Sequence, residues 1–172
     1  CQRSDATAFC DAMEKATGNR PLFLPCDISV TDQLQLTLNT AAQVNGPITV
    51  LVNNAANDQR HETLKTDETF WDWSINVNLR SYFFACQSVI PGMKAAGGGS
   101  IINFSSISFM MADKGYAAYI TANAGIVGLT RTLAREFGPD HIRVNAVAPG
   151  WVLTDRQKEH WVTPEALAAH LA

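Results

Sequence analysis

Polar side chains stand directly after four apolar runs of this chain, where they could bind and orient a polar ligand. They are Asp27, Asn53-Asn54, Ser105-Ser106 and the residues beside the turn-forming pair Pro149-Gly150. A further residue, Tyr119, has a hydroxyl that can give or take a proton. Because a free phenol ionises near pH 10, it needs a nearby positive charge to act as a base at neutral pH. Asn123, four residues later, carries none.

The elements that position these residues follow from the hydrophobic pattern. We predict helices over residues 4–17, from Ser29 or Thr31 to 44, over 68–94 and over 116–137, and strands over 21–25, 48–52, 100–104 and 142–147. Apolar strands joined by helices indicate parallel strands with right-handed crossovers. The predicted fold is therefore α/β, a doubly wound parallel sheet with helices on both faces. Ligands of such sheets bind at the carboxyl ends of the strands, where the polar residues gather.

The composition is that of one domain over residues 1–172, with 47% hydrophobic residues and a net charge of −3. Lys and Arg form no cluster, so we expect no nucleic-acid partner. No apolar run approaches the roughly 20 residues of a membrane span, and the first residues show no signal-peptide pattern, so we expect no membrane and a cytoplasmic protein. Cys1, Cys10, Cys26 and Cys86 lack zinc spacing, which favours reduced thiols and no metal site.

Several motifs resemble those of one enzyme family. They are Asn53-Asn54-Ala55-Ala56, Tyr119-Ile120-Thr121-Ala122-Asn123, Arg143-Val144-Asn145 and Pro149-Gly150-Trp151-Val152-Leu153-Thr154. The chain resembles the short-chain dehydrogenase/reductases, which move a hydride between a nicotinamide cofactor and an alcohol or carbonyl. The resemblance implies a Rossmann-like fold and NAD or NADP as the cofactor.

The resemblance also implies catalytic roles. Tyr119 is the acid/base, Ser106 binds the substrate oxygen, with Ser105 as the fallback, and the backbone carbonyl of Asn78 holds a water on a proton path. Asn123 replaces the family's lysine, whose ammonium stabilises the tyrosinate and whose nitrogen binds the nicotinamide ribose. Tyr116 fits less well, because the residue four positions later is Ile120.

Cofactor contacts follow from the same likeness. It assigns them to Asp27, Ile28, Asn54, Ala55, Ala56, Tyr119, Asn123, Pro149, Gly150, Val152 and Thr154. Of these, Asp27 faces the adenine edge, the backbone at Val152 meets the nicotinamide carboxamide, and Thr154 supports cofactor binding. Ala56 stands where the family has glycine, a change that is tolerable if φ stays negative there.

Two segments resemble those of the aldose 1-dehydrogenases, the subgroup that oxidises xylose, arabinose or galactose. They are the loop Asn57-Asp58-Gln59-Arg60-His61 and the segment after the last predicted strand. Asn57, Asp58 and His61 offer the polar groups that a sugar needs, beside Ser106 and Tyr119. The substrate-side segment covers about residues 151–172. Two alternatives stay open: a catalytically impaired scaffold or partner subunit, and a carbonyl reductase of the ketoacyl type.

The family's glycine-rich phosphate loop has no counterpart here, since Gly97-Gly98-Gly99 enters a strand instead of opening a helix. We therefore expect the sheet to be incomplete at both ends, with the chain matching about the middle two-thirds of a family member. Family members bury the helices from about Glu68 and Tyr116 against a second subunit, which implies a homodimer or homotetramer.

Overall fold

The computed structural model describes residues 3–160 and 162–171, and its fold is α/β. The helices are α1 (Arg3–Thr17), α2 (Thr31–Asn45), α3 (Glu68–Ile75), α4 (Ser81–Ala95), α5 (Ala117–Phe137), α6 (Asp155–His160) and α7 (Pro164–Leu171). The strands are β1 (Val50–Asn53), β2 (Gly99–Phe104) and β3 (Ile142–Val147). No described helix combines the length and the apolar character needed to cross a membrane.

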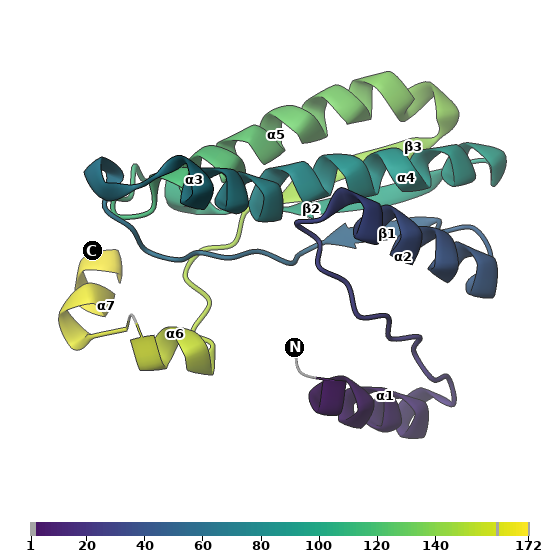
Figure 1. Cartoon of the computed structure of the whole chain (residues 1–172), viewed down its shortest axis with the longest axis horizontal. Coiled ribbons are helices and arrows are strands. Elements are labelled where there is room, and N and C mark those ends of the chain that lie inside the picture. Colours follow the sequence, from purple (N-terminus) through teal and green to yellow (C-terminus); the bar gives the residue numbers. More distant parts are fainter. Residues whose placement is uncertain (1–2, 161, 172) are drawn as a thin grey trace.

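The three strands form one parallel sheet in the order β1-β2-β3. Its register aligns Leu51 with Ile101 and Ile101 with Val144, and all three side chains are buried. They pack under α4 and α5, which lie above the sheet in Figure 1. Val50 and Val52 point to the other face of the sheet and are exposed. The prediction of a parallel α/β sheet is confirmed, and the helices that pack most on it among the described residues cover one face.

Close packing joins α4 to the start of β2. Met93 is fully buried in the core, and a β-carbon added at Gly99 would lie 2.5 Å from its Sδ atom. Cys86, Val89 and Ile90 extend the same apolar face of α4. A side chain at residue 99 would therefore force Met93 to shift within the close-packed core.

A chain of buried amides crosses the layers near the carboxyl ends of the strands. The Asn53 amide on β1 donates to Asn103 Oδ1 on β2 at 2.9 Å. Asn103 Nδ2 in turn donates to the Thr130 hydroxyl on α5 at 3.0 Å. Since unsatisfied buried polar groups are costly, this chain fixes the position of α5 against the strand ends that carry the site.

The predicted helix over 68–94 is interrupted. Between α3 and α4 the residues Asn76–Arg80 form a π-helical turn, in which the Ser81 N–H donates to the Asn76 carbonyl. The physical reason is the side chain of Asn78, whose amide donates to the Ser74 carbonyl at 2.9 Å and so competes with the α-helical bonds. Such widened turns occur frequently at functional sites.

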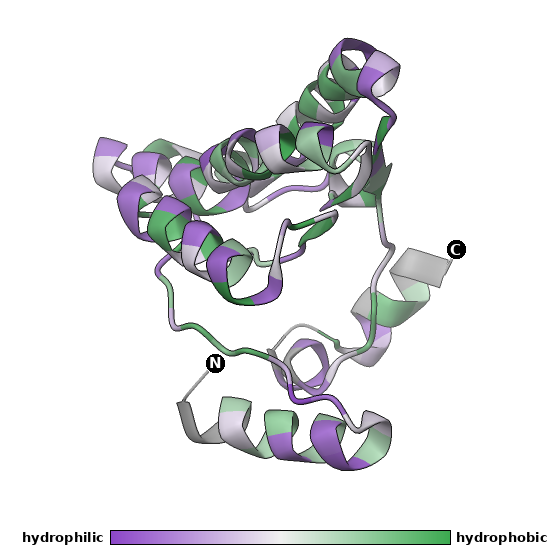
Figure 2. Ribbon diagram, turned by 90° about the vertical axis from the view of Figure 1, so that its right-hand side faces the viewer, coloured by the Kyte–Doolittle hydropathy of each residue, from purple (hydrophilic) through white to green (hydrophobic). Residues whose placement is uncertain are grey.

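The prediction of a strand over residues 21–25 is wrong. This stretch runs as an extended segment from α1, which stands apart from the sheet, toward α2 (Figure 1). Pro21 and Pro25 have no N–H to donate, and the described sheet contains only β1, β2 and β3. Leu22 and Phe23 are 44% and 39% exposed, and the same extended stretch carries hydrophobic colour in Figure 2.

The predicted cap of the second helix is also wrong. The N-cap residue of α2 is Val30, which offers no side-chain hydrogen bond. Ser29 is engaged elsewhere, because its N–H and hydroxyl both donate to Asp27 Oδ1, at 2.9 and 2.6 Å. Ser29 therefore stabilises the turn before α2 and does not cap the helix.

The described cysteines Cys10, Cys26 and Cys86 have free thiols, and Cys1 lies outside the described residues. Burial raises the pKa of the Cys86 thiol to about 12. Within residues 3–160 and 162–171, no group of His, Cys, Asp and Glu side chains is arranged to hold a metal ion.

Candidate active site

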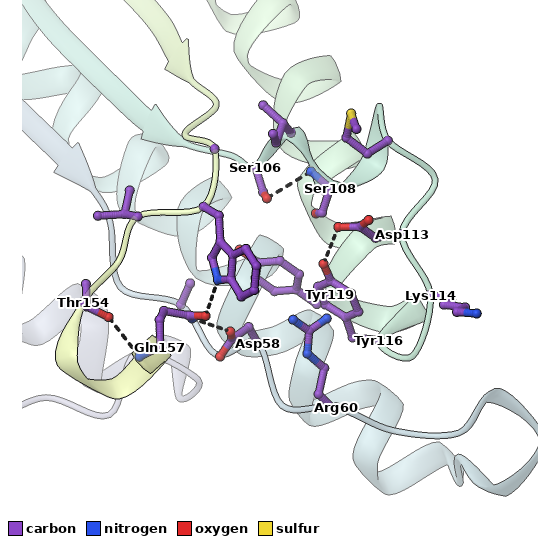
Figure 3. Close-up of a pocket in the computed structure, with 16 residues that line it drawn as sticks. Asp58, Arg60, Ser106, Ser108, Asp113, Lys114, Tyr116, Tyr119, Thr154 and Gln157 are labelled. Carbon is purple, nitrogen blue, oxygen red and sulfur yellow. Dashed lines mark hydrogen bonds between the residues drawn. The ribbon is translucent and has the colours of Figure 1, made fainter. Parts of the chain in front are cut away.

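A cavity of about 650 Å³ opens at the carboxyl ends of the strands. Its walls come from four segments: residues 56–60 after β1, residues 106–114 after β2, the start of α5, and residues 150–157 after β3. Figure 3 shows their side chains converging from separate parts of the chain. The cavity is therefore where a ligand of such a sheet is expected to bind.

Tyr119 enters this cavity from the first turn of α5. Burial raises the pKa of its phenol, and hydrogen bonding with Ser106 opposes the rise. The charge of Asp58 raises this pKa further, while Asn123 and Arg60 lower it. The hydroxyl is thus held in its protonated form, and its ionisation depends on the charges around it.

The two serines after β2 have different roles. Ser106 lines the cavity and its hydroxyl accepts a hydrogen bond from the Ser108 N–H at 3.1 Å, which caps a short 3₁₀ turn. Ser105 is buried, and its hydroxyl donates to the Asn123 carbonyl at 2.9 Å. Ser106 therefore stands beside Tyr119, whereas Ser105 ties the strand end to α5.

Asn123 lies one turn beyond Tyr119 on α5 and is 2% exposed. Its amide Nδ2 donates to the backbone carbonyl of Tyr119 at 2.9 Å. This bond turns the amide along the helix. Asn123 is not among the residues that line the cavity, and as a neutral group it brings no charge to the phenol.

Asn78 also lies behind the cavity wall, in the π-helical turn. Its Oδ1 accepts from the Asn57 N–H at 2.8 Å, and its Nδ2 donates to the Asn57 carbonyl at 3.0 Å. The side chain therefore holds the backbone at the start of the loop that carries Asp58 and Arg60. The predicted role of its backbone carbonyl in a proton path stays a prediction.

A hydrogen-bonded chain connects two walls of the cavity. Trp151 Nε1 donates to Gln157 Oε1 at 2.8 Å, and Gln157 Nε2 donates to Asp58 Oδ2 at 3.2 Å. These bonds join the segment after β3 to the loop after β1 (Figure 3). Asp58 was predicted from the sequence; Trp151 and Gln157 had no site assignment, because their proximity to Asp58 depends on the path of two loops.

A second group that sequence reasoning missed is a stack of three side chains. The Arg60 guanidinium lies 3.5 Å from the centre of the Tyr116 ring, and the Tyr116 ring stacks on that of Tyr119 with centres 5.5 Å apart. The Tyr116 hydroxyl donates to Asp113 Oδ2 at 2.8 Å. Burial raises the pKa of Tyr116, while Arg60 opposes the rise. The spacing of the two tyrosines on one helix was the available signal.

His61 lies outside this cavity. Its Nε2 accepts from the Ala118 N–H at 3.3 Å, so Nδ1 carries the proton and donates to the Gln59 carbonyl at 3.2 Å. The ring also packs against Phe70, with centres 4.7 Å apart. Its contacts are those of a side chain that satisfies the first turn of α5.

The predicted cofactor residues divide in two. Ala56, Gly150, Val152 and Thr154 line the cavity with Tyr119, and Pro149 lies at its rim, where its carbonyl accepts from the Ile107 N–H at 3.2 Å.

The remaining cofactor residues lie elsewhere. Asn54 and Ala55 are exposed beside Ala56, while Asp27 and Ile28 lie just before α2. Two hydrogen bonds from Ser29 lower the pKa of the Asp27 carboxyl.

The cavity walls fit the polar half of a nicotinamide nucleotide. Ser106 and Thr154 present hydroxyls to the cavity. The Thr154 N–H donates to the Val152 carbonyl at 2.8 Å and so fixes the backbone there. An amide and a ribose need such a mixed set of donors and acceptors. The chemistry of the walls is thus compatible with a nicotinamide and its ribose.

Comparisons with known proteins agree with this geometry. The family model described as short chain dehydrogenase matches residues 1–164. The probable galactose dehydrogenase GalD of Rhizobium meliloti is 45% identical over 161 residues, which are 94% of this chain and 63% of that protein. The D-xylose 1-dehydrogenase of Caulobacter vibrioides is 47% identical over 152 residues, 88% of this chain and 59% of that protein.

A solved structure shares the fold as well. The crystal structure of a protein from Sinorhizobium meliloti 1021, titled as a short-chain alcohol dehydrogenase, superposes with a TM-score of 0.88 at 30% identity. It covers 96% of this chain and 65% of that chain. The present chain therefore spans a little under two-thirds of the length of the relatives that it matches.

Proposed function

This chain belongs to the short-chain dehydrogenase family, and we propose that it acts within a nicotinamide-dependent oxidoreductase that oxidises the C1 hydroxyl of an aldose to a lactone. The observation that carries this proposal is the meeting of Tyr119 and Ser106 in one polar cavity at the strand ends. The names of the galactose and xylose dehydrogenase relatives support the sugar as substrate.

In this reaction the Tyr119 oxygen takes the proton of the C1 hydroxyl of the sugar. Ser106 holds the oxygen of that C1 hydroxyl by a hydrogen bond. NAD or NADP, held by the cavity walls around Ser106, Val152 and Thr154, would supply the acceptor for the hydride that leaves C1. The C1–O bond then becomes the carbonyl of the lactone, and the proton leaves through Tyr119. Burial raises the pKa of the Tyr119 phenol, so this proton transfer is the step that depends most on the protein.

The charged groups of the cavity suit a neutral polyhydroxy ligand. Two carboxylates, Asp58 and Asp113, and two cations, Arg60 and Lys114, line it. Asp58 and Gln157, already bonded to each other, offer acceptors and donors to sugar hydroxyls. A polar substrate binds best where several fixed groups match its hydroxyls, which favours an aldose over an apolar ketone.

A second candidate is a protein of the same fold that binds the cofactor but turns over poorly. It is favoured by Asn123, the neutral residue behind Tyr119. Titration of the folded chain with NADH and NADPH by fluorescence, followed by screens of aldoses and of ketones, separates the candidates. Binding with oxidation of an aldose supports the proposal, and binding without turnover supports the second candidate.

The decisive variants are Ser106→Ala and its matched control Ser88→Ala. Ser88 lies on α4, where its hydroxyl donates to the Phe84 carbonyl outside the cavity. We expect Ser106→Ala to lower kcat/KM at least 100-fold and Ser88→Ala to leave it unchanged. Failure of both nucleotides to bind the folded chain, or reduction of ketones with no action on aldoses, would contradict the proposal.

A further inference from the structure

The cavity contains a positive charge that no role described so far uses. A phenol ionises near pH 10, and burial raises the pKa of Tyr119 above that value. A base that works near neutral pH therefore needs a cation close by. Asn123 is neutral and its amide bonds to the backbone carbonyl of Tyr119, so the charge must come from another element.

Two cationic side chains line the cavity, Arg60 and Lys114. Lys114 is exposed and extends away from the phenol in Figure 3. Arg60 instead lies over the Tyr116 ring at 3.5 Å, and that ring stacks on Tyr119. A guanidinium is a planar cation that stacks well on aromatic faces. The stack thus holds a cationic side chain close to the acid/base residue.

We propose that Arg60 is a positioning residue for the reaction, whose guanidinium, held on the Tyr116 ring, stabilises the phenolate of Tyr119. This inference rests on the proposed function, in which Tyr119 is the base. In this proposal the loop after β1 supplies the positive charge near the phenol, which the neutral Asn123 on α5 does not.

The size of the effect follows from the stack. Its two distances place the guanidinium carbon no more than about 9 Å from the centre of the Tyr119 ring. At an effective dielectric near 20, a unit charge at this distance moves a phenol pKa by about one unit. At a given pH below that pKa, the phenolate fraction of Tyr119 is then about tenfold larger than it would be without the guanidinium.

Other titratable or charged groups surround the same phenol. They are Asp58 on the loop after β1, Tyr82 on α4, Asp113 and Lys114 on the segment before α5, and Tyr116 at the N-cap of α5. The carboxylate of Asp58 acts against Arg60, because it raises the pKa of Tyr119. The two loop residues therefore set the ionisation of the phenol in opposite directions.

The test measures the phenol itself. Difluorotyrosine placed at position 119 ionises within the pH range in which the fold is stable, and fluorine NMR follows its titration at that one site. We expect its pKa to rise by about one unit in Arg60→Met, to change by less than half of that in Arg60→Lys, and to fall in Asp58→Asn. Arg80→Met is the matched control, because Arg80 lies over the Phe84 ring, with 5.3 Å to its centre, outside the cavity.

A pKa that does not move in folded Arg60→Met, or that moves equally in Arg80→Met, overturns the proposal. The proposal is also overturned if Arg60→Met shifts the pKa of difluorotyrosine placed at position 116 but not that of difluorotyrosine at position 119. If Arg60→Met does not fold, the fall in Asp58→Asn and the retained value in Arg60→Lys decide instead. The titration needs no cofactor, substrate or turnover, so its result is independent of whether the proposed function holds.

Discussion

Replacing Asn78 by alanine should loosen the loop that brings Ala56, Asp58 and Arg60 to the cavity wall. The side chain is 1% exposed and makes four polar contacts. Two are with the backbone N–H and carbonyl of Asn57, at 2.8 and 3.0 Å. The other two are donated to the carbonyl and hydroxyl of Ser74, at 2.9 and 3.3 Å. Alanine can replace none of them.

The expected cost combines three effects. A partly buried N–H of Asn57 that loses its acceptor costs about 1–3 kcal/mol. The space left by the amide adds about 1 kcal/mol, and the higher helix propensity of alanine returns roughly 0.6 kcal/mol. We therefore expect Asn78→Ala to lower the free energy of unfolding by about 1.5–3.5 kcal/mol.

Urea denaturation measures this value, and hydrogen exchange at the Asn57 amide tests its cause. Asn76→Ala is the matched control, since Asn76 lies two residues earlier in the same π-helical turn, is half-buried and has no side-chain hydrogen bond to a described residue. It should change the free energy by less than about 0.5 kcal/mol. Equal losses in the two variants, or unchanged protection of the Asn57 amide in Asn78→Ala, would refute the reasoning.

Three further changes test the site and its support. Asn123→Lys should lower the pKa of Tyr119 by about two units. An ammonium at about 5 Å and an effective dielectric near 20 contributes roughly 3 kcal/mol. An unchanged phenol titration in the folded variant would contradict this. Asn103→Leu should cost about 2–3 kcal/mol in urea denaturation, because it removes the middle of the buried amide chain; a loss below about 0.5 kcal/mol would sink that account. Burial raises the pKa of Cys86 to about 12 from 9.0, so the folded state disfavours its thiolate. Stability should therefore be full below pH 9 and fall toward pH 12 by up to about 4 kcal/mol, and Cys86→Ala should show a shallower fall above pH 9 if this thiol is responsible.

The main elements of the fold were predictable because their signals are local. The helical pattern of α5 ends at Gly138, and the apolar run of β2 follows a glycine turn, so both were placed correctly to within a residue. The segment 21–25 has the same apolar character as a strand, but a strand exists only where a neighbour pairs with it. Its pairing depends on the rest of the sheet, which no local pattern reports.

The site was predictable to the extent that it follows from topology. Parallel strands end at one edge, which brings Ser106 and Gly150 together with Tyr119 in the cavity. The stack of Arg60 on Tyr116 joins residues far apart in the chain through an irregular loop, and loops have no period from which contacts can be deduced. His61 shows the opposite case, a residue in the predicted loop whose two ring nitrogens serve the backbone.

The state of Tyr119 also sets the direction in which this site works best. A phenol with a raised pKa is protonated at neutral pH, so it readily gives a proton to a carbonyl oxygen and only weakly takes one from an alcohol. Asn123 lowers this pKa through hydrogen bonding, but as a neutral amide it brings no charge to the phenolate. In the proposed reaction, oxidation of a sugar hydroxyl then depends on the groups that lower this pKa, which are Ser106, Asn123 and Arg60, acting against burial and Asp58. Because Asp58 raises the pKa of Tyr119 and Arg60 lowers it, substitution of either loop residue should shift the phenol toward one direction of the proposed reaction.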